Sequence, residues 1–364
     1  MNRLGRRLLP IPPLKLADWP AADQKAWAAA RRADDPLEDP GLAAHWAANT
    51  ADQTALAYGH WLAWLNSEGE LDPDAVPAGR VTRDRARRYL DWLGSTLASS
   101  TVATMITRLH SVASALTPGA ELDWLLAGAT RLRRRAVPVK SKLPRLVESD
   151  RLLEAGMAMM AEATDRPMSP RTRALRYRDG LLIAFLALRP VRLANLAAMS
   201  LDRHLEFDGE GVWVRFAAAE VKNRRPLEFP WPTILLEPLR TYLEVHRPVL
   251  LEGADTPILW LGRLGPLSLK GVQQAIPAAV KRQLGIAIPP HFFRDCAATT
   301  VATRDPEHAR IIASILGHAR QETAERYYNH AQTLTAGRAL QEIVRRQRER
   351  GRKRRPAVHR KAAP

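Results

Sequence analysis

The sequence predicts a mainly α-helical fold with one small antiparallel β-sheet, divided between two domains. The 364 residues suggest about two domains, and an apolar content of 46% is enough to bury a core. Through most of the chain, apolar residues recur at steps of three and four, which is the period of a helix face. The basic, proline-containing stretch RRRAVPVKSKLP, at residues 133–144, interrupts this pattern and is typical of an interdomain linker.

Four helices are predicted in the first domain. The first helix carries an apolar stripe made of Ala55, Tyr58, Leu62 and Leu65. Thr82 is placed to cap the second helix and Ser100 the third, which ends at TPG, and LDWLLAGATRLRRR predicts a short fourth helix. The predicted order is a flexible basic arm (1–42), a helical domain (43–135), a basic linker (136–147), a second domain (148–345) and a basic tail (346–364).

The second domain is predicted to be mostly helical around one β-hairpin. GLLIAFLAL indicates a buried helix, TILLEPLRTYLEVH an amphipathic one, and LSLKGVQQAIPAAVKRQL a helix capped by its serine. GVWVRF and PLEFP are β-branched and aromatic runs on either side of the polar turn KNRR, which predicts a hairpin. PPHFFRDCAATTVAT and DPEHARIIASIL each begin with a proline suited to the first turn of a helix.

The charge balance indicates a polyanionic partner. The formal net charge is +17, and in a folded chain such a clustered surplus favours nucleic acid over a merely tolerated surface excess. Cys296 is the single cysteine, so no intrachain disulfide can form, which fits a reducing cytoplasm. No apolar run reaches the roughly 18 residues of a membrane span, so no membrane partner is expected. The carboxylates are scattered rather than clustered, which argues against a two-magnesium nuclease, and we expect no metal or other cofactor.

Six residues of the second domain form an ordered set suited to phosphoryl transfer: Arg192, Lys222, His291, Arg294, His318 and Tyr327. A spacing of three residues predicts that His291 and Arg294 share a helix face, so that both can aim at one anion. Lys222 lies in the predicted hairpin turn, where its side chain can swing while the backbone stays anchored. Gly317 allows a sharp helix end that exposes His318.

The chemistry of a phosphodiester explains why these residue types belong together. Under attack its equatorial oxygens gather negative charge, which two arginines can clamp bidentately. A phenol held in line is a sufficient nucleophile when a cationic pocket favours its ionised form. The leaving 5′-oxygen needs a proton, which a lysine can supply. Each residue alone is more often a solvated charge, a cap or a core aromatic, so the prediction depends on the ordered set.

This ordered set resembles the signature of the tyrosine recombinase (phage integrase) family. The family order of Arg, Lys, His-x-x-Arg, Gly-His and Tyr is matched by Arg192, Lys222, HFFR, LGH and ERYY, with LGHARQETAERYY the most specific block. LASSTVATMITRLHSVASAL resembles the family's core-binding domain. The resemblance implies a two-domain DNA clamp, in which a helical core-binding (SAM-like) domain and a mixed α+β catalytic domain enclose duplex DNA.

The resemblance also implies a role for each matched residue. Tyr327 would attack the scissile phosphate to form a 3′-phosphotyrosine, Arg192 and Arg294 would hold that phosphate, and Lys222 would protonate the 5′-oxygen. The two histidines would orient groups and stabilise the transition state. Because the phosphotyrosine stores the bond energy, no ATP is required. The implied partners are a double-stranded DNA recombination site, a homotetramer on that DNA, and an accessory DNA-bending or directionality factor, all within the nucleoid.

The sequence departs from the family pattern around the first arginine. The usual Gly-x-Arg-x-x-Glu is PVRLAN here, so Pro190 replaces the glycine and Asn195 the acid. Arg189 competes with Arg192 for the clamping role, and Arg192 is favoured because it keeps the family's spacing to Leu196.

Two further residues compete with members of the set. Tyr328 competes with Tyr327, which the nine-residue gap from His318 favours, and Arg224 lies close to Lys222.

A group of basic residues between the two domains is expected to lie along DNA phosphates as a strap: Arg133, Arg134, Arg135, Lys140 and Lys142. A merely solvated tether is the alternative interpretation of this group. Two other functions are weighed against recombination. One is a catalytically silent DNA-binding regulator of the same fold, although no member of the set is lost. The other is a type IB topoisomerase-like enzyme. Within recombination, we expect DNA integration or recombination of a mobile element.

Overall fold

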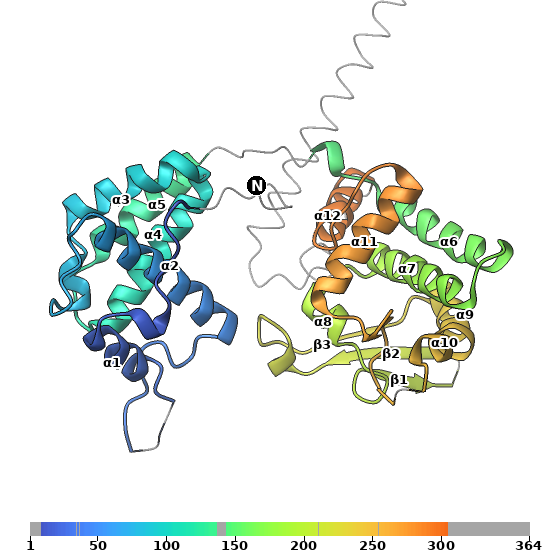
Figure 1. The fold of residues 1–364 in the computed structure, drawn as a ribbon. Helices are drawn as coiled ribbons and strands as arrows, with labels where there is room; N and C mark the ends of the chain where they lie inside the picture. Colours follow the sequence, from blue (N-terminus) through green and yellow to red (C-terminus); the bar gives the residue numbers. More distant parts are fainter. Residues whose placement is uncertain are drawn as a thin grey trace, which may run out of the picture. The chain divides into compact units, whose positions relative to one another are not determined.

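The computed structural model describes residues 9–33, 35, 37–136, 143–209, 211–253 and 255–304. The chain divides into two compact units, Met1–Ser141 and Lys142–Pro364, and each is described by itself (Figure 1). The described residues are mainly helical with a small antiparallel sheet, as the sequence predicts. In the described part of the chain, no helix is both long enough and apolar enough to cross a bilayer.

The first unit is a bundle of helices. Its elements are η1 (Leu16–Asp18), α1 (Ala21–Ala30), α2 (Ala48–Ser67), η2 (Pro77–Arg80), α3 (Arg83–Thr96), α4 (Ser99–Leu116) and α5 (Asp123–Arg135). The predicted stripe of α2 does face the core, where Leu62 and Leu65 are fully buried with Tyr89 of α3 and Leu109 of α4. The bundle therefore depends on the amphipathic pattern of its helices.

The two predicted helix caps in this unit have different outcomes. The Thr82 hydroxyl accepts a hydrogen bond from the Arg85 N–H at 3.3 Å, which confirms it as the cap of α3. The Ser100 cap is wrong, because α4 already begins at Ser99 and follows Ala98, which makes no side-chain cap bond. Ser100 instead lies inside the helix, and its carbonyl accepts from the Thr104 hydroxyl at 2.9 Å.

The prediction of a flexible arm over residues 1–42 is wrong for the described part of that range. Trp19 and Trp27 are buried, and the Trp19 ring lies edge-on to the ring of Tyr58 with centroids 4.9 Å apart. Asp23 of α1, which is fully buried, accepts hydrogen bonds from Arg80 Nη1 at 2.7 Å and from the Tyr58 hydroxyl at 2.8 Å. The chain from Trp19 through α1 is thus part of the bundle core.

The second unit combines helices with a three-stranded sheet. Its helices are η3 (Leu143–Arg145), α6 (Ser149–Asp165), α7 (Pro170–Leu188), α8 (Leu193–Ala198), η4 (Ala218–Glu220), η5 (Thr233–Leu235), α9 (Leu236–Thr241), the π-helix η6 (Tyr242–His246), α10 (Arg247–Leu251), α11 (Leu269–Leu284) and α12 (Phe292–Arg304). Its strands are β1 (Leu205–Asp208), β2 (Gly211–Phe216), β3 (Leu227–Pro230), β4 (Leu261–Gly262) and β5 (Gly265–Pro266).

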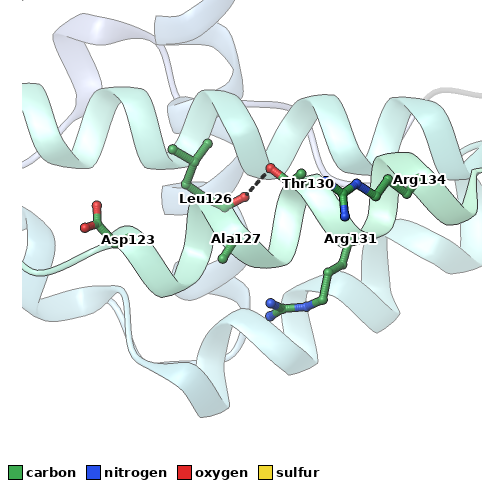
Figure 2. Close-up of a pocket in the computed structure, with 6 residues that line it drawn as sticks. All are labelled: Asp123, Leu126, Ala127, Thr130, Arg131 and Arg134. Atoms are coloured by element: carbon green, nitrogen blue, oxygen red, sulfur yellow. Dashed lines mark hydrogen bonds between the residues drawn. The ribbon is translucent and has the colours of Figure 1, made fainter.

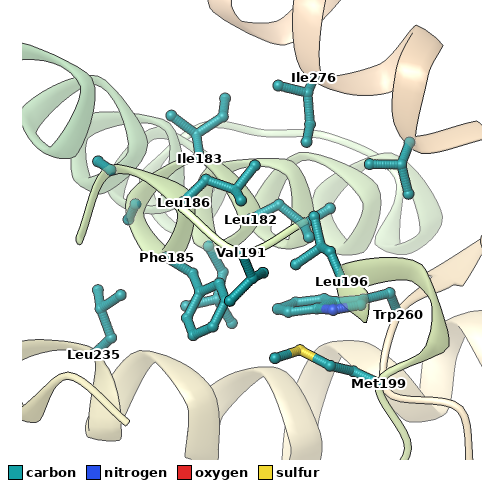
Figure 3. Packing of buried hydrophobic residues seen from close by; sticks show 14 of the residues in the cluster. Leu182, Ile183, Phe185, Leu186, Val191, Leu196, Met199, Leu235, Trp260 and Ile276 are labelled. Carbon is teal, nitrogen blue, oxygen red and sulfur yellow. The ribbon is translucent and has the colours of Figure 1, made fainter. Parts of the chain in front are cut away.

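Helix α7 is the central element of this unit. Ser169 caps it and Pro170 occupies its first turn, and every residue from Gly180 to Ala187 is buried. A helix that is apolar on all sides must be surrounded, and Figure 3 shows α7 residues Leu182 and Phe185 packed among side chains from other elements, including Trp260 and Ile276. This confirms the buried helix predicted from GLLIAFLAL.

Helices α6 and α7 cross at a pair of glycines. A Cβ atom at Gly156 would lie 2.6 Å from the Gly180 carbonyl oxygen, and one at Gly180 would lie 2.7 Å from the Gly156 carbonyl oxygen. The two backbones approach so closely because neither residue carries a side chain.

The sheet has the strand order β1–β2–β3 with antiparallel pairing throughout. In register, Val214 of β2 pairs with Leu205 of β1 and with Phe229 of β3, and all three side chains are buried. The β2–β3 pairing confirms the predicted hairpin, while β1 is an additional strand. The cap of α11 is also confirmed, since the Ser268 hydroxyl accepts from the Gly271 N–H at 3.1 Å.

Candidate active site

The segment after α7 holds Arg192 between two buried apolar residues. Val191 is 8% exposed and Leu196 is fully buried, and both lie in the packed cluster around Phe185 (Figure 3). Arg192 itself is half-buried and is the N-cap residue of α8, with extended backbone angles of φ −67° and ψ 144°. The core packing on either side therefore fixes the backbone position of this arginine.

Arg294 is brought to the same segment from α12. Phe292, Phe293 and Cys296 bury α12 against the core, which leaves Arg294 half-buried beside the Arg192 segment. Arg294 Nη1 donates a hydrogen bond to the Pro190 carbonyl at 2.8 Å. Two arginines that are 102 positions apart in the numbering thus belong to segments in direct contact, as a phosphate clamp requires.

His291 lies immediately before α12 and not within it, one residue outside the helix that the spacing with Arg294 predicts. The N–H groups of Phe292 and Phe293 bond the carbonyls of Pro289 and Pro290 at 2.9 and 3.3 Å, and α12 begins at Phe292. His291 is exposed in the turn immediately before the helix.

Lys222 lies in the turn between β2 and β3, and this turn is also tied to α8. Asn195 of α8 is buried, and its Nδ2 donates to the carbonyl of Glu220 at 3.1 Å. Val221 is 4% exposed, whereas Lys222 is exposed. The lysine therefore follows directly after an anchored residue, with its own side chain in solvent.

Asn195 has a donor that the acid usual in the family lacks. A carboxylate at this position would turn a lone pair toward the Glu220 carbonyl oxygen, and no hydrogen bond could form while it is ionised.

The two rival cations have different surroundings from Arg192 and Lys222. The Arg189 guanidinium lies over the Phe229 ring, 5.3 Å from its centroid, and burial lowers the pKa of Arg189 from its ordinary value. Arg224 has a left-handed backbone with φ 54°, which is uncommon for a residue with a side chain. Arg189 is thus engaged with the sheet, and Arg224 forms the bend of the turn.

Several predicted site residues lie outside the described residues. They are His318, Tyr327 and its rival Tyr328, the strap residues Lys140 and Lys142, and the helix predicted from DPEHARIIASIL. The described part of the predicted catalytic set therefore consists of Arg192, Lys222, His291 and Arg294.

The arginines at the start of the predicted strap belong to a helix. Arg133, Arg134 and Arg135 form the last turn of α5 and are exposed, so RRR is not part of the linker. Arg133 Nη2 donates to the Thr107 hydroxyl of α4 at 3.3 Å. Cations at a helix C-terminus are favoured by the helix dipole, which explains why the helix continues through this charge run.

Sequence reasoning missed Arg131, which lies on the exposed surface of α5 beside the predicted Arg134. Arg131 and Arg134 lie three residues apart and line a shallow pocket of about 430 Å³ with Asp123, Leu126, Ala127 and Thr130. Figure 2 shows both arginines at the C-terminal half of the helix and Asp123 at its start. The i, i+3 spacing was the available signal.

Comparison with known proteins shows which family and which curated relatives the sequence matches. Residues 153–334, half of the chain, match the family model of the phage integrase family. Tyrosine recombinase XerD of Staphylococcus aureus is 28% identical over 153 residues, which cover 42% of this chain and 50% of the relative, and XerD of Staphylococcus saprophyticus is 26% identical over the same length. The chain thus spans about half the length of the curated relatives it matches.

A solved structure gives the same result for the fold. The XerH site-specific recombinase bound to its difH substrate, a pre-cleavage complex, superposes with a TM-score of 0.52 at 15% identity over 79% of this chain and 78% of XerH. With the family model covering half of its residues, this chain belongs to the phage integrase family.

Proposed function

We propose that this protein is a site-specific tyrosine recombinase that cleaves and rejoins DNA in the integration or recombination of a mobile element. Tyr327 is the nucleophile, Arg192 and Arg294 clamp the scissile phosphate, and Lys222 is the general acid. His291 and His318 orient the phosphate and stabilise its transition state. The reaction uses neither metal nor ATP.

Each step replaces one phosphodiester linkage with another. The ionised phenolic oxygen of Tyr327 attacks phosphorus in line, and the bond from phosphorus to the 5′-oxygen breaks as that oxygen takes a proton from Lys222. The product is a 3′-phosphotyrosine and a free 5′-hydroxyl. The 5′-hydroxyl of a partner strand then attacks the phosphotyrosine, returning the proton and releasing Tyr327.

The hydrogen bond from Arg294 to the Pro190 carbonyl is the observation that carries this proposal. It joins two segments whose arginines the motif assigns to one phosphate. The bond from Asn195 to the Glu220 carbonyl supports the proposal, because it ties the turn that carries Lys222 to the helix that follows Arg192.

The proposed partner is a duplex recombination site, bound by four copies of the chain with an accessory DNA-bending or directionality factor. The XerH site-specific recombinase binds a difH substrate in its solved complex, which supports a DNA recombination site as the partner here. Arg133, Arg134, Arg135, Lys140 and Lys142 are proposed to contact its phosphates. Such contacts position a protein on DNA without reading the sequence.

A covalent trapping experiment tests the mechanism. Duplexes bound by the full chain are selected from a randomised pool, and a nick is placed beside the cleavage position so that the released fragment diffuses away. We expect a protein–DNA adduct that resists denaturant, forms in EDTA, and is lost in Tyr327→Phe but kept in Tyr328→Phe.

Four outcomes would contradict the proposal in different ways. An adduct lost in Tyr328→Phe and kept in Tyr327→Phe moves the nucleophile by one residue. An absolute requirement for Mg²⁺ refutes the metal-free mechanism. Relaxation of supercoiled plasmid by the monomer, with no preferred site, would identify a topoisomerase, and the absence of any adduct would favour the silent regulator.

A further inference from the structure

We propose that Asn195, His204 and Glu220 are positioning residues that hold the turn carrying Lys222 against α8. The inference rests on the proposed function, in which Lys222 protonates the leaving oxygen. The three residues act on one point of the chain. Glu220 is held through its main-chain carbonyl by Asn195 and through its side chain by His204, and Lys222 follows two residues later.

His204 links the carboxylate of Glu220 to the body of the second unit. Its ring is 1% exposed and lies against the Phe216 ring of β2 with centroids 4.6 Å apart. The Ser200 N–H donates to His204 Nδ1 at 3.0 Å, so Nδ1 is an acceptor and the ring proton is on Nε2. His204 Nε2 lies 3.0 Å from Glu220 Oε1 and therefore donates to it. Because the Ser200 N–H fixes the tautomer of His204, the hydrogen bond between His204 and Glu220 can run only from the ring to the carboxylate.

The second carboxylate oxygen closes the turn itself. Glu220 Oε2 accepts from the Ala217 N–H at 3.0 Å, and the Glu220 N–H donates to the Ala217 carbonyl at 3.0 Å. Arg203 Nη1, on an exposed side chain, lies 3.4 Å from Glu220 Oε1. Both oxygens of Glu220 are thus occupied within the second unit, which indicates that this carboxylate positions the turn.

Apolar packing contributes little to holding this turn. Lys222, Arg224, Arg225 and Pro226 are exposed, and Val221 is the buried residue within 221–226. A pocket of about 550 Å³ also opens beside it, lined by Ala217, Glu220, Pro226 and Leu227 together with Arg203, Arg215, Phe216 and Glu228. Because one side of the turn is open, the hydrogen bonds to Glu220 fix the backbone position from which the Lys222 side chain extends.

The test compares two leaving groups. On the nicked duplex selected above, the scissile 5′-oxygen is either kept or replaced by sulfur. A thiol, with a pKa of about 8.5, is far more acidic than an alcohol, so the sulfur leaves as a thiolate without a proton donor. Variants that only displace the general acid should therefore be slow with oxygen and normal with sulfur.

We expect Asn195→Asp and Glu220→Ala to slow cleavage of the oxygen substrate by about 10²-fold, the effect of misplacing a catalytic group by roughly 1 Å. Both should cleave the sulfur substrate within about threefold of the unmodified protein, as should Lys222→Ala, because the acid is bypassed. Glu220→Gln keeps one acceptor and should restore part of the rate with oxygen. Glu228→Gln is the matched control, since Glu228 lies in the same hairpin and pairs with Arg215 at 2.9 Å.

Hydrogen exchange of the full chain without DNA supplies a readout that does not need cleavage. Amides of residues 217–224 should exchange at least about tenfold faster in Glu220→Ala and Asn195→Asp than in Glu228→Gln. Unchanged exchange in both variants overturns the inference, even if no adduct ever forms and the proposed function fails. Faster exchange with normal oxygen cleavage, or equal slowing with oxygen and sulfur, also overturns it. In those cases the proposed nucleophile is unaffected, since it is tested separately by adduct formation in Tyr327→Phe.

Discussion

Arg189 and Arg192 lie three residues apart after α7, in different surroundings. The Arg189 guanidinium lies over the ring of Phe229 in the sheet, so the face of this guanidinium is used for packing. Arg192 follows Pro190, whose carbonyl accepts from Arg294, so its backbone is part of the contact between two segments. These surroundings support the proposal that Arg192, and not Arg189, clamps the phosphate.

Replacing each arginine by lysine separates the two roles. We expect Arg192→Lys to lower the rate of adduct formation by about 10²–10³-fold, because lysine keeps the charge and loses the planar fork that matches two phosphate oxygens. Arg189→Lys, the matched control, should change the rate by less than about threefold and lower the melting temperature slightly. The reverse ranking in single-turnover cleavage would assign the clamp to Arg189.

Glu220 also predicts a pH dependence at the scale of one residue. The Ala217 N–H, and next the hydrogen bond from His204, lower the pKa of Glu220 below its ordinary value of 4.5. A carboxyl with a lowered pKa in the folded state stabilises the fold above the pKa of the unfolded chain and loses this effect as the pH falls through the folded pKa.

We therefore expect the stability difference between the unmodified protein and Glu220→Gln to be constant above about pH 5 and to shrink below about pH 4. Urea unfolding at a series of pH values measures it. A difference that grows on acidification would show that the ionised carboxylate is not the stabilising form.

At the scale of elements, the crossing of α6 and α7 is sensitive to one added methyl group. We expect Gly180→Ala to lower the free energy of unfolding by about 1–3 kcal/mol, because its Cβ would meet the Gly156 carbonyl and Met160. Gly94→Ala in α3 is the control of opposite sign. Its Cβ meets no atom within 4 Å, so the lower backbone entropy of alanine should stabilise the first unit by about 0.5–1 kcal/mol. Thermal unfolding of both variants gives the comparison, and a neutral Gly180→Ala would mean that the helices can separate without cost.

Elements with a local signal in the sequence were predictable, and the others were not. Thr82 and Ser268 cap their helices because a hydroxyl three residues before a free N–H is a local property. Helix α1 was missed because its buried positions include Asp23, whose partner Arg80 is 57 residues away. Strand β1 has four residues, of which three are exposed, so its sequence lacks the alternation of apolar and polar residues that predicts a strand.

The candidate site was predictable as a set of residues, and its supporting contacts were not. Arg192, Lys222 and Arg294 stand out by order and spacing. Their segments are joined through main-chain carbonyls of Pro190 and Glu220, and a carbonyl acceptor has no residue type to identify it. His204 was missed for a similar reason, because its role depends on a tautomer set by the N–H of Ser200.

For the whole molecule, the net charge of +17 predicts a steep salt dependence of DNA binding. We expect the double variant Arg131→Gln/Arg134→Gln to weaken binding to a duplex of arbitrary sequence and to reduce the slope of log K against log salt by about 2. Arg240→Gln is the control, since Arg240 pairs with Glu237 at 2.6 Å on α9. Fluorescence anisotropy over a salt series measures both slopes, and an unchanged slope in the double variant would remove this face of α5 from the DNA contacts.

The burial of Asp23 against Arg80 bears on where the chain can be shortened. Removing the residues that precede α2 would delete a segment whose composition alone suggests that it is dispensable. It would also remove Asp23, the counter-ion of the fully buried Arg80 guanidinium, together with the buried indoles of Trp19 and Trp27. An orphaned charge at such depth costs about 3–5 kcal/mol, a large part of the stability of a small domain. Residues 19–30 therefore complete the interior of the first unit, and we expect a chain that begins at α2 to be strongly destabilised.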